Sequence, residues 1–168
     1  MKVFVVIVTF NRKELLKRSI ESVRANQPFG IIVINNGSTD GTKEWLDSQP
    51  DLIVIHQKNV GGSGGFYTGI KHAYNMGADW IWCMDDDVFP RADCLKNLLD
   101  NATDKNIGIL APRRIMDGKI FCHDFQGYNL TRPFKSMYRQ RLVNEQVTSP
   151  TFIAGTAFEG PFIRREVV

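Results

Sequence analysis

The sequence has little cysteine, no long hydrophobic run and no strong excess of charge, and each absence excludes a class of protein. Its 168 residues include three cysteines, which form no Cys-x-x-Cys pair and cannot all join in disulfides. A reducing, cytosolic setting therefore fits better than a secreted one. No apolar run approaches the roughly 20 residues of a membrane helix. The apolar run at residues 3–8 ends without the small residues of a signal-peptide cleavage site, so we expect a first strand there.

The net charge is +3, and it is distributed unevenly along the chain. Residues 1–100 hold 11 Lys and Arg against 12 Asp and Glu, whereas residues 101–168 hold 10 against 6. This offset is too small to predict a nucleic-acid-binding protein. It fits an ordinary solvated surface. The alternative is a surface, including Arg139 and Arg141, that meets an anionic substrate or the phosphate-bearing face of a membrane.

Hydrophobic patterning predicts that strands alternate with helices through the first two thirds of the chain. Continuous apolar runs, typical of strands buried on both faces, occur at residues 3–8, 30–34, 52–55, 80–84 and 106–111. Apolar residues at helical spacing lie between these runs. The alternation predicts an α/β fold, a single domain whose mostly parallel sheet has flanking helices and right-handed crossovers.

The pattern weakens from residue 112 onward. Residues 119–122 and 152–162 resemble strands, the second with glycine interruptions. Residues 164–168 resemble the first turn of a helix that has no continuation. We therefore expect that this chain is a fragment.

Three aspartates, Asp85, Asp86 and Asp87, directly follow the apolar run that begins at Trp80. Open α/β sheets bind ligands outside the carboxyl ends of their strands. Because adjacent carboxylates repel one another, a fold that keeps them together is expected to hold a cation. Asp85 and Asp87 share a side of an extended chain, whereas Asp86 points elsewhere. The alternative is an acidic turn in which Asp86 or Asp87 caps the next helix.

A glycine-rich loop, residues 61–65 (GGSGG), opens a predicted helix. Such a loop lets backbone amides approach a phosphate or a sugar closely. It is not a Walker loop, because no Gly-Lys-Ser/Thr ends it, and Tyr67 departs from the dinucleotide fingerprint. The alternative is a turn that permits close packing of helix and sheet.

Two polar segments, residues 9–12 (TFNR) and residues 35–38 (NNGS), follow the first two predicted strands. Because parallel strands end at one edge of a sheet, these segments are expected to share a crevice with the aspartates. Asparagine can match the donor and acceptor edge of a base, and Arg12 can reach a phosphate. The alternative is helix capping, which Asn11 and Ser38 can supply alone.

Taken together, these motifs resemble the family 2 glycosyltransferases of GT-A fold, which is Rossmann-like. The landmarks are VTFNR at residues 8–12, NNGSTDGT at residues 35–42 and DDD at residues 85–87. Residues 59–66 (NVGGSGGF) resemble the galactofuranosyltransferase and rhamnosyltransferase branch. The resemblance covers nearly the whole chain, and its order and spacing are more specific than any single motif.

The resemblance implies a nucleotide-sugar donor, UDP- or TDP-linked, and a divalent metal, Mn²⁺ or Mg²⁺, held by Asp85 and Asp87. The donor contacts that it implies are Thr9, Phe10, Asn11, Arg12, Asn35, Asn36, Asn59, Gly61, Gly62, Ser63, Asp85 and Asp86. Where the family commonly has an acid that contacts uracil, this sequence has Asn35 and Asn36. The identity of the base therefore stays open.

The resemblance also implies a donor-binding half, residues 1–111, and the start of an acceptor-side half, residues 112–168. Inverting transfer to a glycan or lipid-linked acceptor needs a general base. Glu159 and Glu166 do not match the family's position for it, so we expect the base beyond Val168. The implied setting is polysaccharide or cell-wall biosynthesis in the cytoplasm, with peripheral contact to the inner membrane face.

Two other functions stay open at this point. A chain without its base can be a nucleotide-sugar-binding module that catalyses nothing. Asp85 and Asp87 after a strand also begin the motif of haloacid-dehalogenase-like phosphatases, with Asp85 as nucleophile. Against this, Phe89 stands where that motif has Thr or a similar residue. The three histidines are scattered, and we expect them to be structural.

Overall fold

The computed structural model describes residues 1–121 and 159–168. Met1–Leu110 and Glu159–Val168 form one compact unit, and Ala111–Phe158 forms a second. The elements are, in chain order, β1 (Val3–Thr9), α1 (Lys13–Arg24), β2 (Gly30–Asn35), α2 (Thr42–Asp47), β3 (Leu52–His56), α3 (Gly61–Asn75), β4 (Trp80–Asp85), α4 (Cys94–Asn101), β5 (Ile109–Leu110), β6 (Arg114–Met116), β7 (Lys119–Phe121), β8 (Phe162–Arg164) and a 3-10 turn (Arg165–Val167). The predicted alternation of strands and helices is confirmed.

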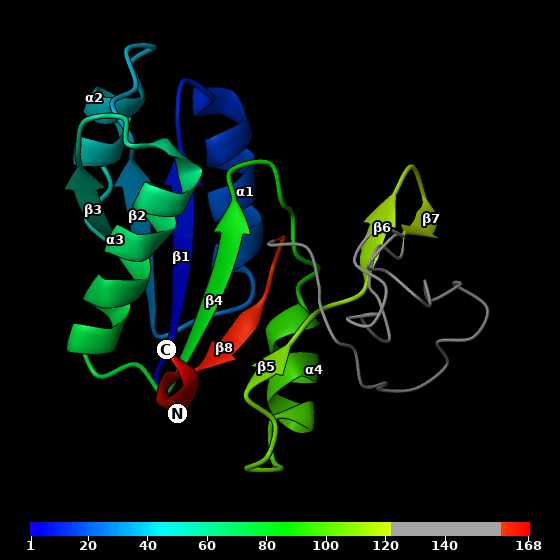
Figure 1. Ribbon diagram of the computed structural model, residues 1–168. Coiled ribbons are helices and arrows are strands. Elements are labelled where there is room, and N and C mark those ends of the chain that lie inside the picture. Colours follow the sequence, from blue (N-terminus) through cyan, green and yellow to red (C-terminus); the bar gives the residue numbers. More distant parts are fainter. Residues whose placement is uncertain (122–158) are drawn as a thin grey trace, which may run out of the picture. The chain divides into compact units, whose positions relative to one another are not determined.

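A six-stranded sheet forms the centre of the first unit, in the order β3-β2-β1-β4-β8-β5 (Figure 1). The first four strands in this order are parallel. β8 lies between β4 and β5 and runs antiparallel to both. The mostly parallel sheet predicted from the sequence is therefore confirmed, with one antiparallel strand that returns from the end of the chain.

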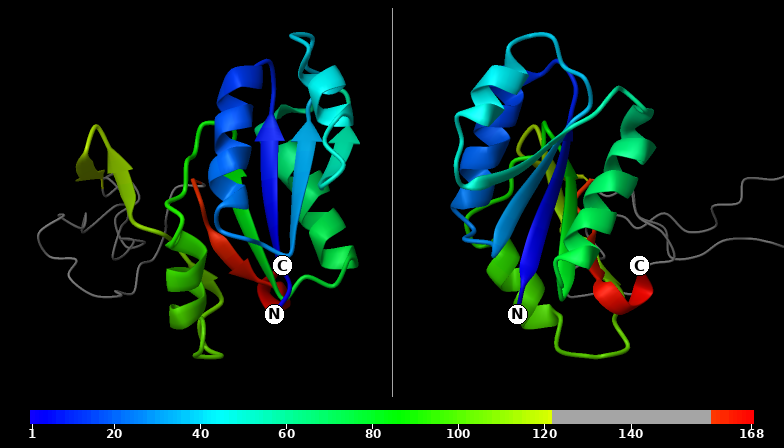
Figure 2. Two further views of the ribbon diagram at one scale, coloured as in Figure 1. Left: turned by 180° about the vertical axis from the view of Figure 1, so that it is seen from behind. Right: turned by 90° about the vertical axis from the view of Figure 1, so that its left-hand side faces the viewer.

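Helices cover both faces of this sheet, as the views in Figure 2 show for α1 and α3. Alternate residues of β1 divide between two cores: Val5 and Ile7 pack with α1, α2 and α4, whereas Phe4 and Val6 pack with α3. All four side chains are at most 1% exposed. Burial on both faces is the reason that these strands are continuous apolar runs.

The described part of the second unit is a hairpin in which β6 pairs antiparallel with β7. Asp117 and Gly118 connect the two strands, and both have positive φ, as two-residue hairpin turns require. β7 accounts for most of the strand predicted at residues 119–122. Of the strand predicted at residues 152–162, residues 152–158 lie outside the described residues, and Phe162 is the first residue of β8. Among the described residues, no helix is long and apolar enough to cross a membrane.

Candidate functional site

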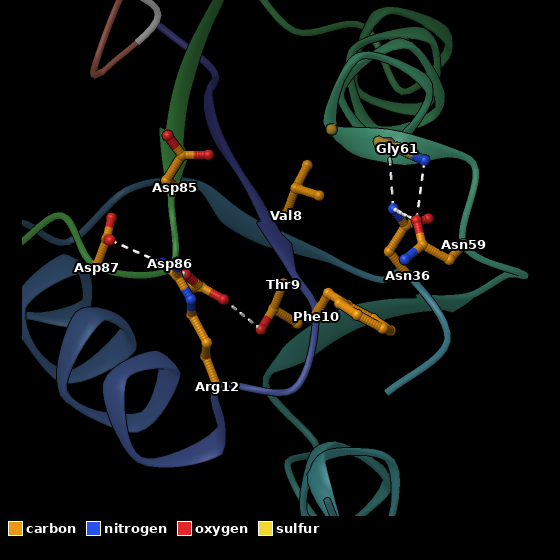
Figure 3. Close-up of a pocket in the computed structure, with 11 residues that line it drawn as sticks. Val8, Thr9, Phe10, Arg12, Asn36, Asn59, Gly61, Asp85, Asp86 and Asp87 are labelled. Atoms are coloured by element: carbon orange, nitrogen blue, oxygen red, sulfur yellow. Dashed lines mark hydrogen bonds and ion pairs between the residues drawn. The ribbon is translucent and has the colours of Figure 1, made fainter. Parts of the chain in front are cut away.

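A cavity of about 560 Å³ lies at the carboxyl ends of β1, β2 and β4 (Figure 3). Its lining residues are Val8, Thr9, Phe10, Arg12, Asn36, Asn59, Gly61, Gly62, Asp85, Asp86 and Asp87. Nine of the twelve predicted donor contacts line it, as do both predicted metal ligands. Asn11, Asn35 and Ser63 are not among the lining residues. The shared edge of parallel strands thus collects motifs that are far apart in the sequence.

The three aspartates of residues 85–87 have different partners. Asp86 is 4% exposed, and its carboxylate accepts a hydrogen bond of 2.7 Å from the Thr9 hydroxyl. The Arg12 guanidinium lies 3.3 Å from Asp86 and 2.8 Å from Asp87. Among the described residues, the Asp85 side chain has no hydrogen-bond or ion-pair partner, and no dashed line reaches it in Figure 3. Within residues 1–121 and 159–168, Asp85 is therefore the one of the three carboxylates without a side-chain partner.

The electrostatics of the site follow from this arrangement. Burial raises the pKa of Asp85, and the neighbouring charges of Asp87, Asp86 and Glu159 raise it further. Burial also raises the pKa of Asp86, although the hydrogen bond from Thr9 and the charge of Arg12 oppose the shift. Crowded carboxylates in a half-buried position favour any ligand that brings positive charge.

The alternative function of the aspartates, helix capping, is not observed. α4 begins at Cys94, and its N-cap position is Asp93, whose side chain makes no capping hydrogen bond. The predicted cap for α1, Asn11, is also wrong, because Arg12 occupies that N-cap position. Asn11 has φ of 54° and accepts a hydrogen bond of 2.7 Å from the Thr39 backbone instead. It therefore joins the loops that follow β1 and β2.

Asn36 fastens the glycine-rich loop to the end of β2. Its amide nitrogen donates to the Asn59 side chain and to the Gly61 carbonyl, both at 3.1 Å. Its amide oxygen accepts from the Gln57 side chain at 2.9 Å and from the Val60 backbone at 3.3 Å. Both donors and both acceptor positions are thus used within the protein. Asn36, which was predicted to contact the base of the nucleotide, therefore holds the loop in place.

Asn35 has a similar internal role. It is 3% exposed, and its side chain bonds to His56 and accepts from the Ser38 backbone. The other ring nitrogen of His56 lies 2.9 Å from Asp47. This histidine is therefore structural, as expected.

The glycine-rich loop presents open backbone to the cavity. Gly61 has φ of 77°, a conformation that favours glycine, and its N–H donates to the Asn59 side chain. A Cβ at Gly61 or Gly62 would meet no atom within 4 Å. A ligand group can therefore approach the first turn of α3 closely, where backbone N–H groups have no helical acceptor.

The donor set suits a hard divalent cation that shares its coordination with a ligand. Among the described residues, no three His, Cys, Asp or Glu side chains converge on one point that could hold an ion. Magnesium and similar ions are often held by one or two carboxylates together with substrate phosphates. Asp85 and Asp87, the two predicted metal ligands, both line the cavity.

Glu159 is a further acidic residue, and it does not match the family's position for the general base. It precedes β8, and its charge acts on Asp85. An antiparallel strand brings its beginning to the same edge, and no local signal in the sequence predicts that direction.

Comparison with known proteins identifies the family. Residues 4–158 match the family model for glycosyl transferase family 2. Over 112 residues the chain is 36% identical to the galactofuranosyltransferase GlfT1 of Mycolicibacterium smegmatis, covering 64% of this chain and 37% of that protein. It is 29% identical over 126 residues to an undecaprenyl-phosphate mannosyltransferase of Micrococcus luteus, covering 71% of this chain and 51% of that protein. The chain thus spans between about a third and a half of these relatives.

Solved structures share the fold. The mannosyltransferase PcManGT from Pyrobaculum calidifontis, solved with GDP-Man and Mn²⁺, superposes with a TM-score of 0.55 at 22% identity, covering 67% of this chain and 36% of its own. The S. aureus protein TarS, residues 1–349 in complex with UDP, gives 0.56 at 18% identity, covering 71% and 37%. These likenesses agree with the GT-A architecture that the sequence predicted.

Proposed function

The chain belongs to glycosyl transferase family 2, and on that premise we propose that the cavity at the carboxyl ends of β1, β2 and β4 binds a nucleotide-diphosphate sugar as donor for sugar transfer. The observation that carries the proposal is the Asp85 carboxylate, which has no side-chain partner in the part of the chain that the structure describes and lines one cavity with Arg12 and the glycine-rich loop. The carboxylates are complementary to a cation. The guanidinium and the backbone N–H groups of the loop are complementary to a diphosphate.

In this proposal the diphosphate end of the donor lies between the aspartates and the start of α3. Asp85 and Asp87 hold the divalent cation, which neutralises charge on the departing diphosphate when it is bound. Arg12 now pairs with Asp87 through side chains that are each about half exposed, 51% and 48%. Exposed pairs of this kind contribute about 1 kcal/mol or less. Exchanging the Asp87 contact for a phosphate oxygen therefore costs little as long as Arg12 keeps its contact with the buried Asp86.

The nucleoside end lies toward Phe10, Asn59 and Gly61. The Phe10 ring is 45% exposed and lines the cavity, which suits stacking on a base. Asn36 acts by holding the loop, because its own amide is satisfied within the protein. We propose UDP or TDP as the nucleotide; relatives of this fold have been solved with UDP and with GDP-Man.

The reaction proposed is inverting transfer to a hydroxyl of a glycan or lipid-linked acceptor. Cell-wall or polysaccharide biosynthesis is the proposed setting, in line with the galactofuranosyltransferase relatives. Peripheral contact with an anionic membrane face is expected of the basic second half. Arg139 and Arg141, which would test that contact, lie outside the described residues. A nucleotide-sugar-binding fragment without transfer activity is the second candidate, favoured by the short span of the chain relative to its relatives.

Isothermal titration calorimetry with UDP, TDP and GDP, each with and without Mn²⁺, tests the donor site. We expect saturable binding of at least one nucleotide that needs Mn²⁺ and that Asp85→Asn abolishes. Asp100→Asn is the matched control, because this exposed acid pairs with Lys96 on α4 and does not line the cavity. No binding of any nucleotide by the unmodified chain would contradict the proposal. An assay for transfer of the sugar from the bound donor to an acceptor glycan then distinguishes an enzyme from a fragment that only binds the donor.

A further inference from the structure

The turn after β1 presents two side chains to the cavity from either side of a third residue. Phe10 and Arg12 line the cavity, whereas Asn11 between them does not. In Figure 3 the Arg12 side chain points toward the aspartates, and the Phe10 side chain points away from them. Because a residue's two backbone dihedrals set the relative direction of its neighbours, the placement of both side chains depends on the backbone at Asn11.

That backbone has an uncommon conformation. Asn11 has φ of 54°, in the left-handed region. Residues other than glycine rarely adopt this conformation, and asparagine tolerates it better than most. An alanine at this position disfavours it, so the turn that separates Phe10 from Arg12 would be populated for a smaller fraction of the time.

The loop after β2 holds Asn11 in this conformation. The Asn11 backbone N–H donates to the Ser38 hydroxyl at 2.9 Å, and the Asn11 side-chain oxygen accepts from the Thr39 backbone at 2.7 Å. The Ser38 backbone in turn donates to the buried Asn35 side chain at 3.0 Å, which ties this loop to the end of β2. Neither Ser38 nor Thr39 lines the cavity. The contact between the two loops therefore fixes the turn without entering the space proposed for the nucleotide.

We propose that Asn11 is a positioning residue of the donor site, which acts by holding Phe10 and Arg12 in the directions that the nucleotide requires. The inference rests on the proposed function, because Phe10 is the residue proposed to stack on the base and Arg12 the residue proposed to contact the diphosphate. This role differs from the direct donor contact that the sequence predicts for Asn11.

Isothermal titration calorimetry with UDP, TDP and GDP in the presence of Mn²⁺ tests this inference in variants of the full chain. We expect Asn11→Ala to weaken binding of the tightest of these nucleotides about tenfold, because the turn then adopts the binding conformation only about a tenth of the time. Asn11→Gly removes the same amide but permits the left-handed conformation, so a loss of only about threefold is expected. Ser38→Ala removes the acceptor of the Asn11 N–H and should also cost about threefold.

Asn101→Ala is the matched control for loss of an asparagine side chain. Asn101 is exposed at the end of α4, donates to the Asn97 carbonyl in the same helix and does not line the cavity. Its substitution should leave the affinity unchanged. Circular dichroism and urea denaturation of each variant separate a loss of binding from a loss of folding.

Equal losses in Asn11→Ala and Asn11→Gly would mean that the amide itself contacts the nucleotide, and would overturn the inference. An unchanged affinity in Asn11→Ala or in Ser38→Ala, or an equal loss in Asn101→Ala, would overturn it as well. If Asn11→Ala does not fold, the affinity of Ser38→Ala decides. The proposed function survives each of these results, whereas failure of the unmodified chain to bind any of the three nucleotides would overturn both.

Discussion

Asp86 is the most deeply buried of the three aspartates, and its environment explains why it belongs to the fold as much as to the site. Its carboxylate is 4% exposed and has a hydroxyl on one side and a guanidinium on the other. A buried carboxylate without such partners would cost several kcal/mol. Thr9, the last residue of β1, and Arg12, in the loop after it, therefore fix the position of the segment that carries Asp85 and Asp87.

Thr9→Val tests this role, because valine keeps the shape of threonine and removes the hydroxyl. We expect a loss of about 1 to 3 kcal/mol in the free energy of unfolding, since the Asp86 carboxylate loses a buried partner. Urea denaturation followed by circular dichroism measures the change. Thr68→Val is the control: its hydroxyl donates only to the Gly64 carbonyl in its own helix, and we expect little effect. Equal losses in both variants would contradict the assignment.

Asn36 shows why a departure from a family motif can have a structural cause. Its amide donates two hydrogen bonds, to the Asn59 side chain and the Gly61 carbonyl. A carboxylate at this position has no donor to offer and would face two acceptors. The sequence indicated that an acid was missing, but only the arrangement of Gln57, Val60 and Gly61 around the amide explains the asparagine.

At the scale of the element, α3 has two kinds of glycine. Gly61 and Gly62 face open space at its beginning, whereas Gly65 and Gly69 pack against β1. A Cβ at Gly69 would lie 2.3 Å from the Val6 Cγ1, which real atoms do not tolerate. The sequence left two roles open for these glycines, approach of a ligand and close packing of helix and sheet. Both occur in α3, in different turns of the helix.

Gly69→Ala and Gly62→Ala separate these two roles. We expect Gly69→Ala to lower the free energy of unfolding by about 1 to 3 kcal/mol through overpacking, despite the better helix propensity of alanine. Gly62→Ala should change stability by about 0.5 kcal/mol or less but weaken nucleotide binding, because its methyl group enters the space proposed for the diphosphate. Denaturation and calorimetry measure the two effects. A stable Gly69→Ala protein would mean that helix and sheet are not in close contact there.

Asp40 joins the beginnings of two helices. Its carboxylate accepts from the Lys13 backbone at 3.0 Å, at the start of α1, and from the Thr42 backbone and hydroxyl at 3.2 and 2.5 Å, at the start of α2. Desolvation alone would raise the pKa of Asp40, but the hydrogen bonds from Thr42 and Lys13 outweigh it and lower the pKa. Asp40, rather than the predicted Asn11, supplies the side chain at the start of α1.

A pH dependence follows from that lowered pKa. The stabilisation by Asp40 is fully present above the pKa of an unfolded aspartate, about 3.9, and is lost as pH falls through the lower folded value. We expect Asp40→Ala to be about 1 kcal/mol less stable than the unmodified chain near neutral pH, with the difference shrinking in acid. Urea denaturation at a series of pH values measures it. Glu21→Gln, an exposed change on α1, should stay within about 0.5 kcal/mol; a pH-independent deficit for Asp40→Ala would argue against the assignment.

At the scale of the whole molecule, the end of the chain completes the sheet that its beginning starts. The Phe162 ring, 0% exposed, stacks on Trp80 with ring centroids 4.5 Å apart. The Arg164 guanidinium donates to the backbone carbonyls of Ala102, Asp104 and Ile107. These contacts join the return strand to the segment between α4 and β5, so the first unit depends on residues 159–168.

Phe162→Ala measures that dependence. Removing a fully buried ring should cost about 3 to 5 kcal/mol of unfolding free energy, because it leaves a cavity between β8 and α4. Urea denaturation followed by tryptophan fluorescence reports the change, because Trp80, one of three tryptophans, stacks on Phe162. Phe29→Ala, at a ring that is 61% exposed, is the control and should cost much less. If Phe162→Ala unfolds with the midpoint of the unmodified chain, β8 is not part of the cooperative unit.

What the sequence determined by itself was local: where buried strands run, where they end, and which polar residues stand at those ends. Continuous apolar runs and turn residues encode burial and backbone angles within a few positions, so the sheet, the aspartates and the glycine loop were predictable. Which residues become partners was decided only by the tertiary structure. The bond from Thr9 to Asp86 spans 77 positions, and the stacking of Phe162 on Trp80 depends on an antiparallel strand inserted between β4 and β5. Register and strand direction arise from packing across the whole sheet, so no local sequence pattern predicts them.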